Sequence, residues 1–485
     1  YTLHKNVQTT PYATIGGTST IQRSITEGIL QKYPNLVFNN GNNRFPSTSF
    51  TSNDSKLLES FLGDRFGSMI WVCDASLLTD IINQIATDPR FSSYNASSTD
   101  PGGWYNGYYQ KLPNTYQFIE RYFGGYLMSE LNYGNLMAVG GLRYEKDKSI
   151  YDAYILMDGR DEKSQKFFKV TSFPQNEFWL PMVQAKYNAF DWLDVRASYT
   201  QTLARPDYHQ LSPNYTISYG QGTVRSGNPN LKTAHAYNHD LMFTVHTNEI
   251  GLFSISGFYK EIEDFTYSTQ FPLFDEAPEG IATTNSFNIG GTKPVKGATL
   301  YTYMNSPYTA YIRGVELDLQ TRFWYLPFPL NGIVLSFNYT AISSNATYPW
   351  RNARTIIIGP RQTLTTVFDS TRSGRLINQP NNILNASIGY DMNDFSARVS
   401  FLFQGNAVSY VGNFPEQDAF TRDYFRIDAS VRQKLPWYGI EIFLDLANIN
   451  SAKNSSAQRS IGGFTSEQNY GLTANLGIRL RLSNK

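Results

Sequence analysis

The chain has 485 residues, of which 41 are basic and 40 acidic, and the two signs of charge are mixed along its length. This balance, without any cluster of basic residues, argues against nucleic acid as a partner. No apolar run reaches the ~18 residues that a transmembrane helix needs, and the single cysteine, Cys73, excludes an internal disulfide framework and an all-thiolate metal site.

The first 112 residues differ from the rest of the chain. They are rich in Asn, Ser, Gly and Tyr, and they contain two helix-like stretches. The longer stretch, DASLLTDIINQIATDPR, offers Asp74 as an N-cap, an apolar face around Ile81 and a stop at Pro89. The shorter stretch, SNDSKLLESFLG, ends at Gly63. We therefore expect short helices within residues 1–112.

From about residue 113 onward, segments of alternating apolar and polar residues recur, and very short turns alternate with long polar connections. The short turns lie near Asn132, Asp191, Asn248, Pro327, Asn393 and Pro436. The pattern predicts about thirteen strands. They begin near Tyr116, Gly134, Asn176, Leu193, Ala234, Gly251, Tyr311, Leu330, Asn382, Phe395, Asp423, Gly439 and Asn469.

Such alternation of turns is typical of outer-membrane β-barrels, whose short turns are periplasmic and whose long loops are extracellular. Each predicted strand has one apolar face, such as Val315, Leu317 and Leu319, and one polar face. The polar faces collect charges that a soluble core would rarely hold, so we expect them to face a water-filled or plugged lumen. These charges are Glu316, Asp318, Arg398, Arg426, Asp428, Arg432, Glu441 and Asp445.

Residues 1–112 are accordingly expected to be an extracellular loop or lid region, and residues 113–485 an antiparallel transmembrane barrel. Aromatic residues next to the short turns fit an interfacial girdle, with packing within the hairpins as the alternative. These residues are Tyr133, Trp192, Trp324, Trp437 and Tyr438. If Pro436 and Trp437 alone form their turn, Arg432 faces Glu441 as an opposite-charge pair in the lumen.

Several stretches, in this order, resemble the C-terminal barrel of TonB-dependent outer-membrane receptors. They are QFIERYFGGYLMSELNYGNLMAVGGLRYE, ASYTQTLARPDYHQLSP, SGNPNLKTAHAYNHDLMF, SISGFYKEIEDF, YIRGVELDLQ and LSFNYT. The resemblance covers roughly residues 115–485. It implies an all-β fold in which this chain supplies about thirteen C-terminal strands of a barrel of about 22 strands, with the other strands and a plug domain upstream.

The resemblance also implies a place and a function. The location would be the Gram-negative outer membrane, in contact with lipid and lipopolysaccharide. The protein would import a scarce nutrient such as a siderophore, cobalamin, an oligosaccharide or a peptide, with energy supplied by the TonB–ExbB–ExbD complex through the plug. A surface lipoprotein is a further partner of one branch of the family. A passive porin, or a barrel that anchors a surface complex, is the alternative from another class.

Candidate site residues are few. The stretch ARPDYHQ places Arg205, Asp207, Tyr208 and His209 just beyond the outer end of a strand, where they could bind ligand or simply build the loop. No nucleophile-plus-base pattern or Gly-x-Ser-x-Gly elbow is present, so we expect no enzyme. His239 and His246 differ in parity and cannot share one strand face, and no metal or cofactor is expected.

Overall fold

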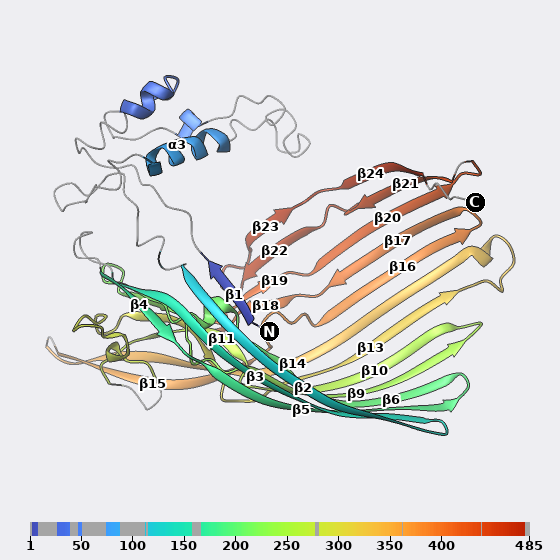
Figure 1. Cartoon of the computed structure of the whole chain (residues 1–485), viewed down its shortest axis with the longest axis horizontal. Coiled ribbons are helices and arrows are strands. Elements are labelled where there is room, and N and C mark those ends of the chain that lie inside the picture. The colour runs from blue at the N-terminus through green and yellow to red at the C-terminus, as the bar shows by residue number, and fades with distance from the viewer. Residues whose placement is uncertain are drawn as a thin grey trace.

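The structure is a computed structural model that describes residues 2–7, 27–38, 47–50, 74–87, 112, 115–157, 166–276, 281–360, 362–437 and 439–480. Fourteen strands form one antiparallel ladder in which each pairs with the next, in chain order (Figure 1). They are β1 (Thr2–Val7), β2 (Tyr116–Tyr133), β3 (Leu136–Met157), β5 (Gln175–Phe190), β6 (Leu193–Ala204), β9 (Ala234–Thr247), β10 (Gly251–Glu263), β13 (Ala310–Arg322), β14 (Ile333–Gly359), β16 (Asn382–Met392), β17 (Phe395–Gln404), β20 (Tyr424–Lys434), β21 (Ile440–Ala447) and β24 (Thr473–Leu480).

The last thirteen of these strands confirm the thirteen predicted from the sequence. The fourteenth, β1, lies in the segment for which only loop and helix were predicted. It pairs with the outer part of β2, from Thr2 opposite Arg121 to Val7 opposite Tyr116. No pairing joins β1 to β24 among the described residues, so the sheet is open (Figure 1).

The register brings like faces together along the whole ladder. Paired residues of adjacent strands point to the same side of a sheet. On one face Leu319 pairs with Phe337, which in turn pairs with Ala386. On the other face Asp318 pairs with Asn338, which pairs with Asn385. This is the apolar-out, polar-in alternation of a transmembrane barrel, and about eleven residues of each strand next to a short turn suffice to cross the apolar layer.

The apolar face continues to the end of the chain, where Leu476 pairs with Leu444 and its side chain is 76% exposed. A side chain of this kind would be a liability in water, and it is explained if lipid covers it. The predicted girdle residues Tyr133, Trp192 and Trp324 are also exposed. Trp324 donates its indole N–H to the carbonyl oxygen of Asn248 at 2.8 Å, which links two neighbouring hairpin turns.

The short turns lie along one end of the sheet (Figure 1). The predicted pairing of Arg432 with Glu441 at the last of these turns is wrong. Arg432 pairs with Phe443, and Glu441 pairs with Lys434. The backbone N–H of Leu435 bonds to the carbonyl of Ile440 at 2.8 Å, so the turn is longer by two residues than the Pro436–Trp437 turn assumed.

The two-residue shift preserves parity, so Arg432 and Glu441 stay on the polar face but find other partners. Glu441 accepts from Arg479 on β24 at 3.1 Å, and Arg432 lies 4.0 Å from Asp445. Gly477 leaves room for the Phe443 ring, because a Cβ at position 477 would lie 2.4 Å from the ring. On the polar face near this turn, two ion pairs therefore form, between Glu441 and Arg479 and between Arg432 and Asp445.

The opposite end of the ladder carries an outer head built from long connections. Strands from these connections extend the end of β3: β4 pairs with β3, β3 with β7, β7 with β8, β8 with β12, and β12 with β11. Their bounds are β4 Lys166–Ser172, β7 Tyr215–Ser218, β8 Thr223–Ser226, β11 Thr266–Pro272 and β12 Thr299–Asn305. Two of the pairings, β3–β7 and β8–β12, are parallel.

The outer head has a hydrophobic core of its own. Ile217, Val224, Leu273 and Leu300 are at most 1% exposed and pack in one cluster with Met157 of β3. A second cluster joins Phe265, Tyr267 and Tyr348, which lie at the base of a long hairpin formed by β14 and β15 (Gln362–Gly374). The head is thus a folded layer with buried side chains.

The remaining elements are small. A four-stranded sheet contains β18 (Ala407–Tyr410), β19 (Ala419–Thr421), β22 (Lys453–Gln458) and β23 (Phe464–Asn469). Residues 27–32 are helical, and the other helices include η1 (Ser47–Phe50), α3 (Ala75–Thr87), α6 (Tyr208–Leu211), η4 (Thr284–Phe287), η5 (Leu330–Gly332) and η6 (Pro415–Gln417). None of the helices in the described ranges is long and apolar enough to cross a membrane.

Helix α3 confirms one prediction for the N-terminal region. The side chain of Asp74 accepts from the backbone N–H of Leu77 at 2.9 Å, which is an N-cap contact. The other predicted helix, at 52–63, and Cys73 lie outside the described residues.

Candidate functional site

The segment that follows β6 carries the four residues singled out from the sequence, and the first of them, Arg205, is held by one ion pair and one ring contact. Arg205 pairs with Glu145 of β3 at 2.7 Å, and its guanidinium lies 5.4 Å from the ring of Tyr122 on β2. Glu145 also accepts from Arg143 at 2.6 Å. Arg205 therefore anchors the segment to the wall formed by β2 and β3.

Tyr208 makes a second anchor. Its hydroxyl donates to Glu120 Oε2 at 2.9 Å, and the hydroxyl of Tyr122 donates to the same oxygen at 2.8 Å. Its ring centroid also lies 4.9 Å from that of the fully buried Phe118. Tyr208 thus holds the segment against the outer end of β2 through one hydrogen bond and one ring contact.

Asp207 begins the short helix α6. Its backbone N–H donates to Gln210 Oε1 at 3.0 Å, and its carbonyl accepts from the backbone N–H of Leu211 at 3.1 Å. These contacts are local to the turn. Its position resembles that of a helix-starting residue.

The SGNPNLK stretch packs directly on α6. Gly227 approaches so closely that a Cβ there would lie 2.2 Å from the carbonyl oxygen of Ser212. The backbone N–H of Asn228 donates to the carbonyl of Gln210 at 2.6 Å. Glycine at position 227 is therefore required by close backbone approach. Two stretches that are separate in the sequence form one wall.

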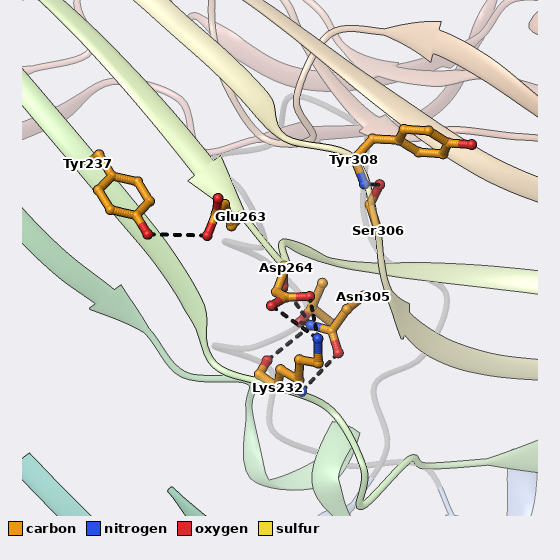
Figure 2. Close-up of polar contacts among 8 residues, drawn as sticks. Lys232, Tyr237, Glu263, Asp264, Asn305, Ser306 and Tyr308 are labelled. Carbon is orange, nitrogen blue, oxygen red and sulfur yellow. Dashed lines mark hydrogen bonds and ion pairs between the residues drawn. The ribbon is translucent and has the colours of Figure 1, made fainter. Parts of the chain in front are cut away.

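The end of the SGNPNLK stretch is clasped to the strands of the head (Figure 2). Asn305, at the end of β12, accepts from the backbone N–H of Lys232 at 2.8 Å and donates to the carbonyls of Lys232 and Asp264 at 3.0 and 2.6 Å. The Lys232 ammonium lies 3.2 Å from Asp264. We call Lys232, Asp264 and Asn305 the clasp. It fixes the point where β10 leaves the ladder for the head.

Beside this wall lies a cleft of about 730 Å³. Its aromatic lining comes from Tyr116, Tyr301, Tyr303, Tyr410 and His209. Its polar lining comes from Ser212, Asn214, Thr216, Gln221, Arg225, Ser226, Gly227, Ser268, Thr269, Gln270 and Thr302. A volume of this size is typical of small-molecule sites. The lining residues come from β2, α6, β7, β8, β11, β12, β18 and the turns between them, so the head has to be folded for the cleft to exist.

The cleft combines flat rings with one fixed cation. The Arg225 guanidinium lies over the Tyr301 ring at 4.8 Å, and the His209 ring meets Tyr303 edge-on at 5.6 Å. Burial raises the pKa of Tyr410 above its ordinary value. Its hydroxyl, like that of any tyrosine, is protonated at neutral pH and can donate a hydrogen bond. The described lining contains no Asp or Glu. The arrangement is therefore suited to an anionic ligand with flat apolar faces.

The four sequence-predicted residues are thus divided between two surroundings. Arg205 and Tyr208 contact the carboxylates of β2 and β3, Asp207 starts α6, and His209 lines the cleft. Four residues of the cleft were not predicted from the sequence: Arg225, Tyr301, Tyr303 and Tyr410. The available signal was the abundance of tyrosine in the long connections, but it does not indicate which tyrosines converge.

The family model described as "TonB dependent receptor-like, beta-barrel" matches residues 4–449. The chain belongs to the TonB-dependent receptor family. It is thus an all-β, antiparallel barrel chain of a family of outer-membrane transport receptors. Among curated proteins no match was found.

Two solved structures of outer-membrane receptors are similar to this chain, and the first of them shares its fold. The ferric-catecholate import receptor Fiu from E. coli K12 matches with a TM-score of 0.51 and 13% identity, over 78% of this chain and 46% of Fiu. The Serratia marcescens hemophore receptor HasR matches with a TM-score of 0.47 and 12% identity, over 76% of this chain and 52% of HasR. This TonB-dependent receptor chain therefore spans about half the length of these relatives.

Proposed function

We propose that this chain forms the C-terminal part of the barrel of a TonB-dependent importer, and that its ligand is an anionic chelate with aromatic rings, of the ferric catecholate siderophore class. The observation that carries the proposal is the tyrosine-lined cleft around Arg225. Other nutrients suggested by the sequence, such as cobalamin, an oligosaccharide or a peptide, fit its chemistry less well, because the described lining has one guanidinium and no carboxylate.

The chemistry of the cleft supports capture of such a ligand. Tyrosine rings offer flat apolar faces, and their hydroxyls donate hydrogen bonds to anionic oxygens. Arg225 is exposed and its guanidinium lies over the Tyr301 ring, so the charge is oriented by the ring and open to an incoming anion. Arg225 would thus provide the charge, and Tyr301, Tyr303 and Tyr410 the contact area.

In this proposal the outer head is extracellular and the short turns are periplasmic. Ligand bound at the head would pass inward when a plug, encoded in the part of the protein that lies outside this chain, rearranges under force from TonB–ExbB–ExbD. The part of residues 1–112 that follows β1 would contribute an extracellular lid, which the sequence predicts for this region. A surface lipoprotein could cover the same face, and lipopolysaccharide would surround the barrel.

The direct test is uptake of radioactive iron as a catecholate chelate by cells that carry the full-length protein as their one receptor of this kind. We expect uptake that requires TonB. Uptake that persists without TonB would indicate a passive porin, and uptake of haem or cobalamin in place of the catecholate would overturn the ligand class.

A pair of variants locates the effect. Arg225→Ala should lower chelate affinity by about tenfold, the loss expected for one charged contact worth ~1.5 kcal/mol. Arg398→Ala is the matched control, because it also removes one arginine that has a single neighbouring partner. Arg398 is bonded to Asp391 at 3.1 Å and lies on β17 near a short turn, away from the cleft. Equal losses in both variants would contradict the assignment of the cleft.

A further inference from the structure

A depression of about 630 Å³ lies on the outer wall of the ladder and shares no residue with the cleft. It is formed where β13, β14 and β16 are neighbours (Figure 1). Its apolar part comes from Val315 and Ala341, which pair with each other on the face that also bears Leu317. The opposite face of β13 is closed at this point, because a Cβ at Gly314 would lie 2.4 Å from the Phe258 ring. The depression therefore opens toward the lipid side of the sheet.

The outer rim of the depression is polar and lies at the edge of the apolar layer. Counted from the short turns, Arg313, Ser343 and Asn382 stand about ten or eleven residues along β13, β14 and β16. A transmembrane strand crosses the hydrocarbon in ~9–11 residues, so these side chains reach the level of the lipid headgroups. The polar lining is completed by Ser344, Arg375 and Asn381.

Arg375, which follows β15, is a cation with neutral partners. Its guanidinium donates to Asn406 Oδ1, to the Asn406 carbonyl and to the Gln379 carbonyl, each at 2.8 Å. Its Nε atom is buried and has no hydrogen-bond partner in the described part of the chain. Burial lowers the pKa of Arg375, as expected for a cation with no carboxylate beside it. These contacts hold the side chain in place and leave its charge uncompensated.

Arg313 is the second cation of the depression. It is exposed, and among the described residues neither Arg313 nor Arg375 forms an ion pair. Glu261 lies diagonal to Arg313 across β10, but it accepts from the Tyr259 hydroxyl at 3.0 Å and is not part of the lining. Two guanidinium groups thus border one depression whose described lining has no carboxylate. At the edge of a layer of low dielectric constant, such charges are stabilised by an anion between them.

We infer that Arg313 and Arg375 bind a phosphate group of a lipid headgroup in the outer leaflet. Arginine matches phosphate because its planar guanidinium can donate two parallel N–H bonds to one group. Neutral donors lie in the same lining. Asn382 Oδ1 accepts from the Tyr339 hydroxyl at 2.8 Å, which leaves the amide N–H groups of Asn382 available to the ligand. The acyl chains of the lipid would then follow the apolar wall below the rim, beginning at Val315.

The test measures binding of bisphosphorylated lipid A to the purified full-length protein in detergent by native mass spectrometry, with dephosphorylated lipid A as the comparison. The wild-type protein should bind the phosphorylated lipid about tenfold more tightly or better. Arg313→Gln and Arg375→Gln should each lower that affinity about tenfold, the loss expected for one charged contact. The matched control is Arg354→Gln, which removes an exposed arginine of β14 that lies outside the lining and should leave the affinity unchanged.

Unchanged affinity in Arg313→Gln would overturn the inference, as would equal binding of the two lipids by the wild-type protein. Inorganic phosphate is the second probe, and displacement of the lipid by an equal concentration of phosphate would reject the lipid headgroup as the ligand. Heat resistance on semi-native gels establishes that each variant is folded. If Arg375→Gln does not fold, Arg313→Gln still decides, because Arg313 is exposed. The site rests on the proposed orientation of the head but not on the imported ligand, so failure of iron uptake with intact lipid binding would count against the import proposal only.

Discussion

The ladder and the outer head differ in where their apolar side chains lie: those of the ladder are exposed on one face, and those of the head are buried in a core. On the ladder, Ile388 and Leu476 are 51% and 76% exposed on a single apolar face. In the head, Leu273 and Val224 are fully buried in a core that joins loop strands to the end of β3. One chain thus uses lipid as the apolar environment for its strands and its own side chains for its loops.

This difference explains why the head can present a preformed cleft. Long loops usually carry little regular structure, whereas here they add strands, a core and a clasp. A cleft built from a packed layer needs less ordering when ligand binds than one built from separate mobile loops.

The largest effect should come from opening the core of the head. Leu273→Ala should destabilise the head by about 2–5 kcal/mol, because a cavity replaces a fully buried side chain. Hydrogen exchange of residues 215–226 and 299–305 should become faster. Leu476→Ala, on the exposed face of β24, should leave exchange in the head unchanged. Equal effects of the two variants would deny the head a core of its own.

The next effect separates the two faces of one strand. Ile388 and Ser387 are neighbours on β16, and they pair with Val399 and Ser400 of β17. Ile388→Arg should destabilise the barrel by about 2–4 kcal/mol if it meets lipid, and Ser387→Arg by about 1 kcal/mol or less. Urea unfolding in lipid vesicles measures both. A larger loss for Ser387→Arg would reverse the assignment of the faces.

The backbones of the SGNPNLK stretch and of the segment around α6 approach closely at Gly227, and one added methyl group would break this approach. Gly227→Ala places a Cβ 2.2 Å from the Ser212 carbonyl, so the wall must shift, at about 1–3 kcal/mol. Ligand affinity should fall with it. Gly220→Ala is the control, because nothing lies within 4 Å of a Cβ there. Unchanged affinity in Gly227→Ala would show that the wall does not shape the cleft.

The smallest effect appears only at alkaline pH. Burial raises the pKa of Tyr215 to about 12, above the ~10 of an unfolded tyrosine. The folded head therefore holds this proton more tightly, and the resulting stability is complete below pH ~10 and is lost as pH rises toward 12. Hydrogen exchange of the head between pH 9 and 12 should show the loss. Tyr215→Phe should weaken this pH dependence, and an unaltered profile would contradict the burial of Tyr215.

The regular part of the fold could be predicted from the sequence because strand faces alternate with period two. Apolar residues such as Leu317 alternate with polar ones such as Glu316, so the two faces of a strand can be predicted from its sequence. Where a short turn joins two strands, their pairing can be predicted as well. Register at the Pro436 turn could not be predicted, because a turn longer by two residues gives the same alternation. β1 was missed because its six residues form too short an alternating segment.

The cleft could be predicted only in part. His209 lies in a recognisable stretch, whereas Arg225, Tyr301 and Tyr410 come from three different connections. Their meeting depends on the parallel β8–β12 pairing, in which Tyr301 lies opposite Arg225. The two segments of a parallel pair are far apart in the sequence and too short to show a clear alternation. Their pairing therefore cannot be predicted from the local sequence pattern.

The central claim, a transmembrane ladder with its head outside the cell, is tested most directly by cysteine labelling of intact cells. In full-length protein with Cys73 replaced by serine, single cysteines would be placed at two exposed short-turn residues, Asp191 and Asp394, and at two exposed head residues, Gln221 and Glu416. A membrane-impermeant maleimide should label positions 221 and 416 in intact cells, and positions 191 and 394 only after the outer membrane is opened. Labelling of 191 or 394 in intact cells would contradict the account.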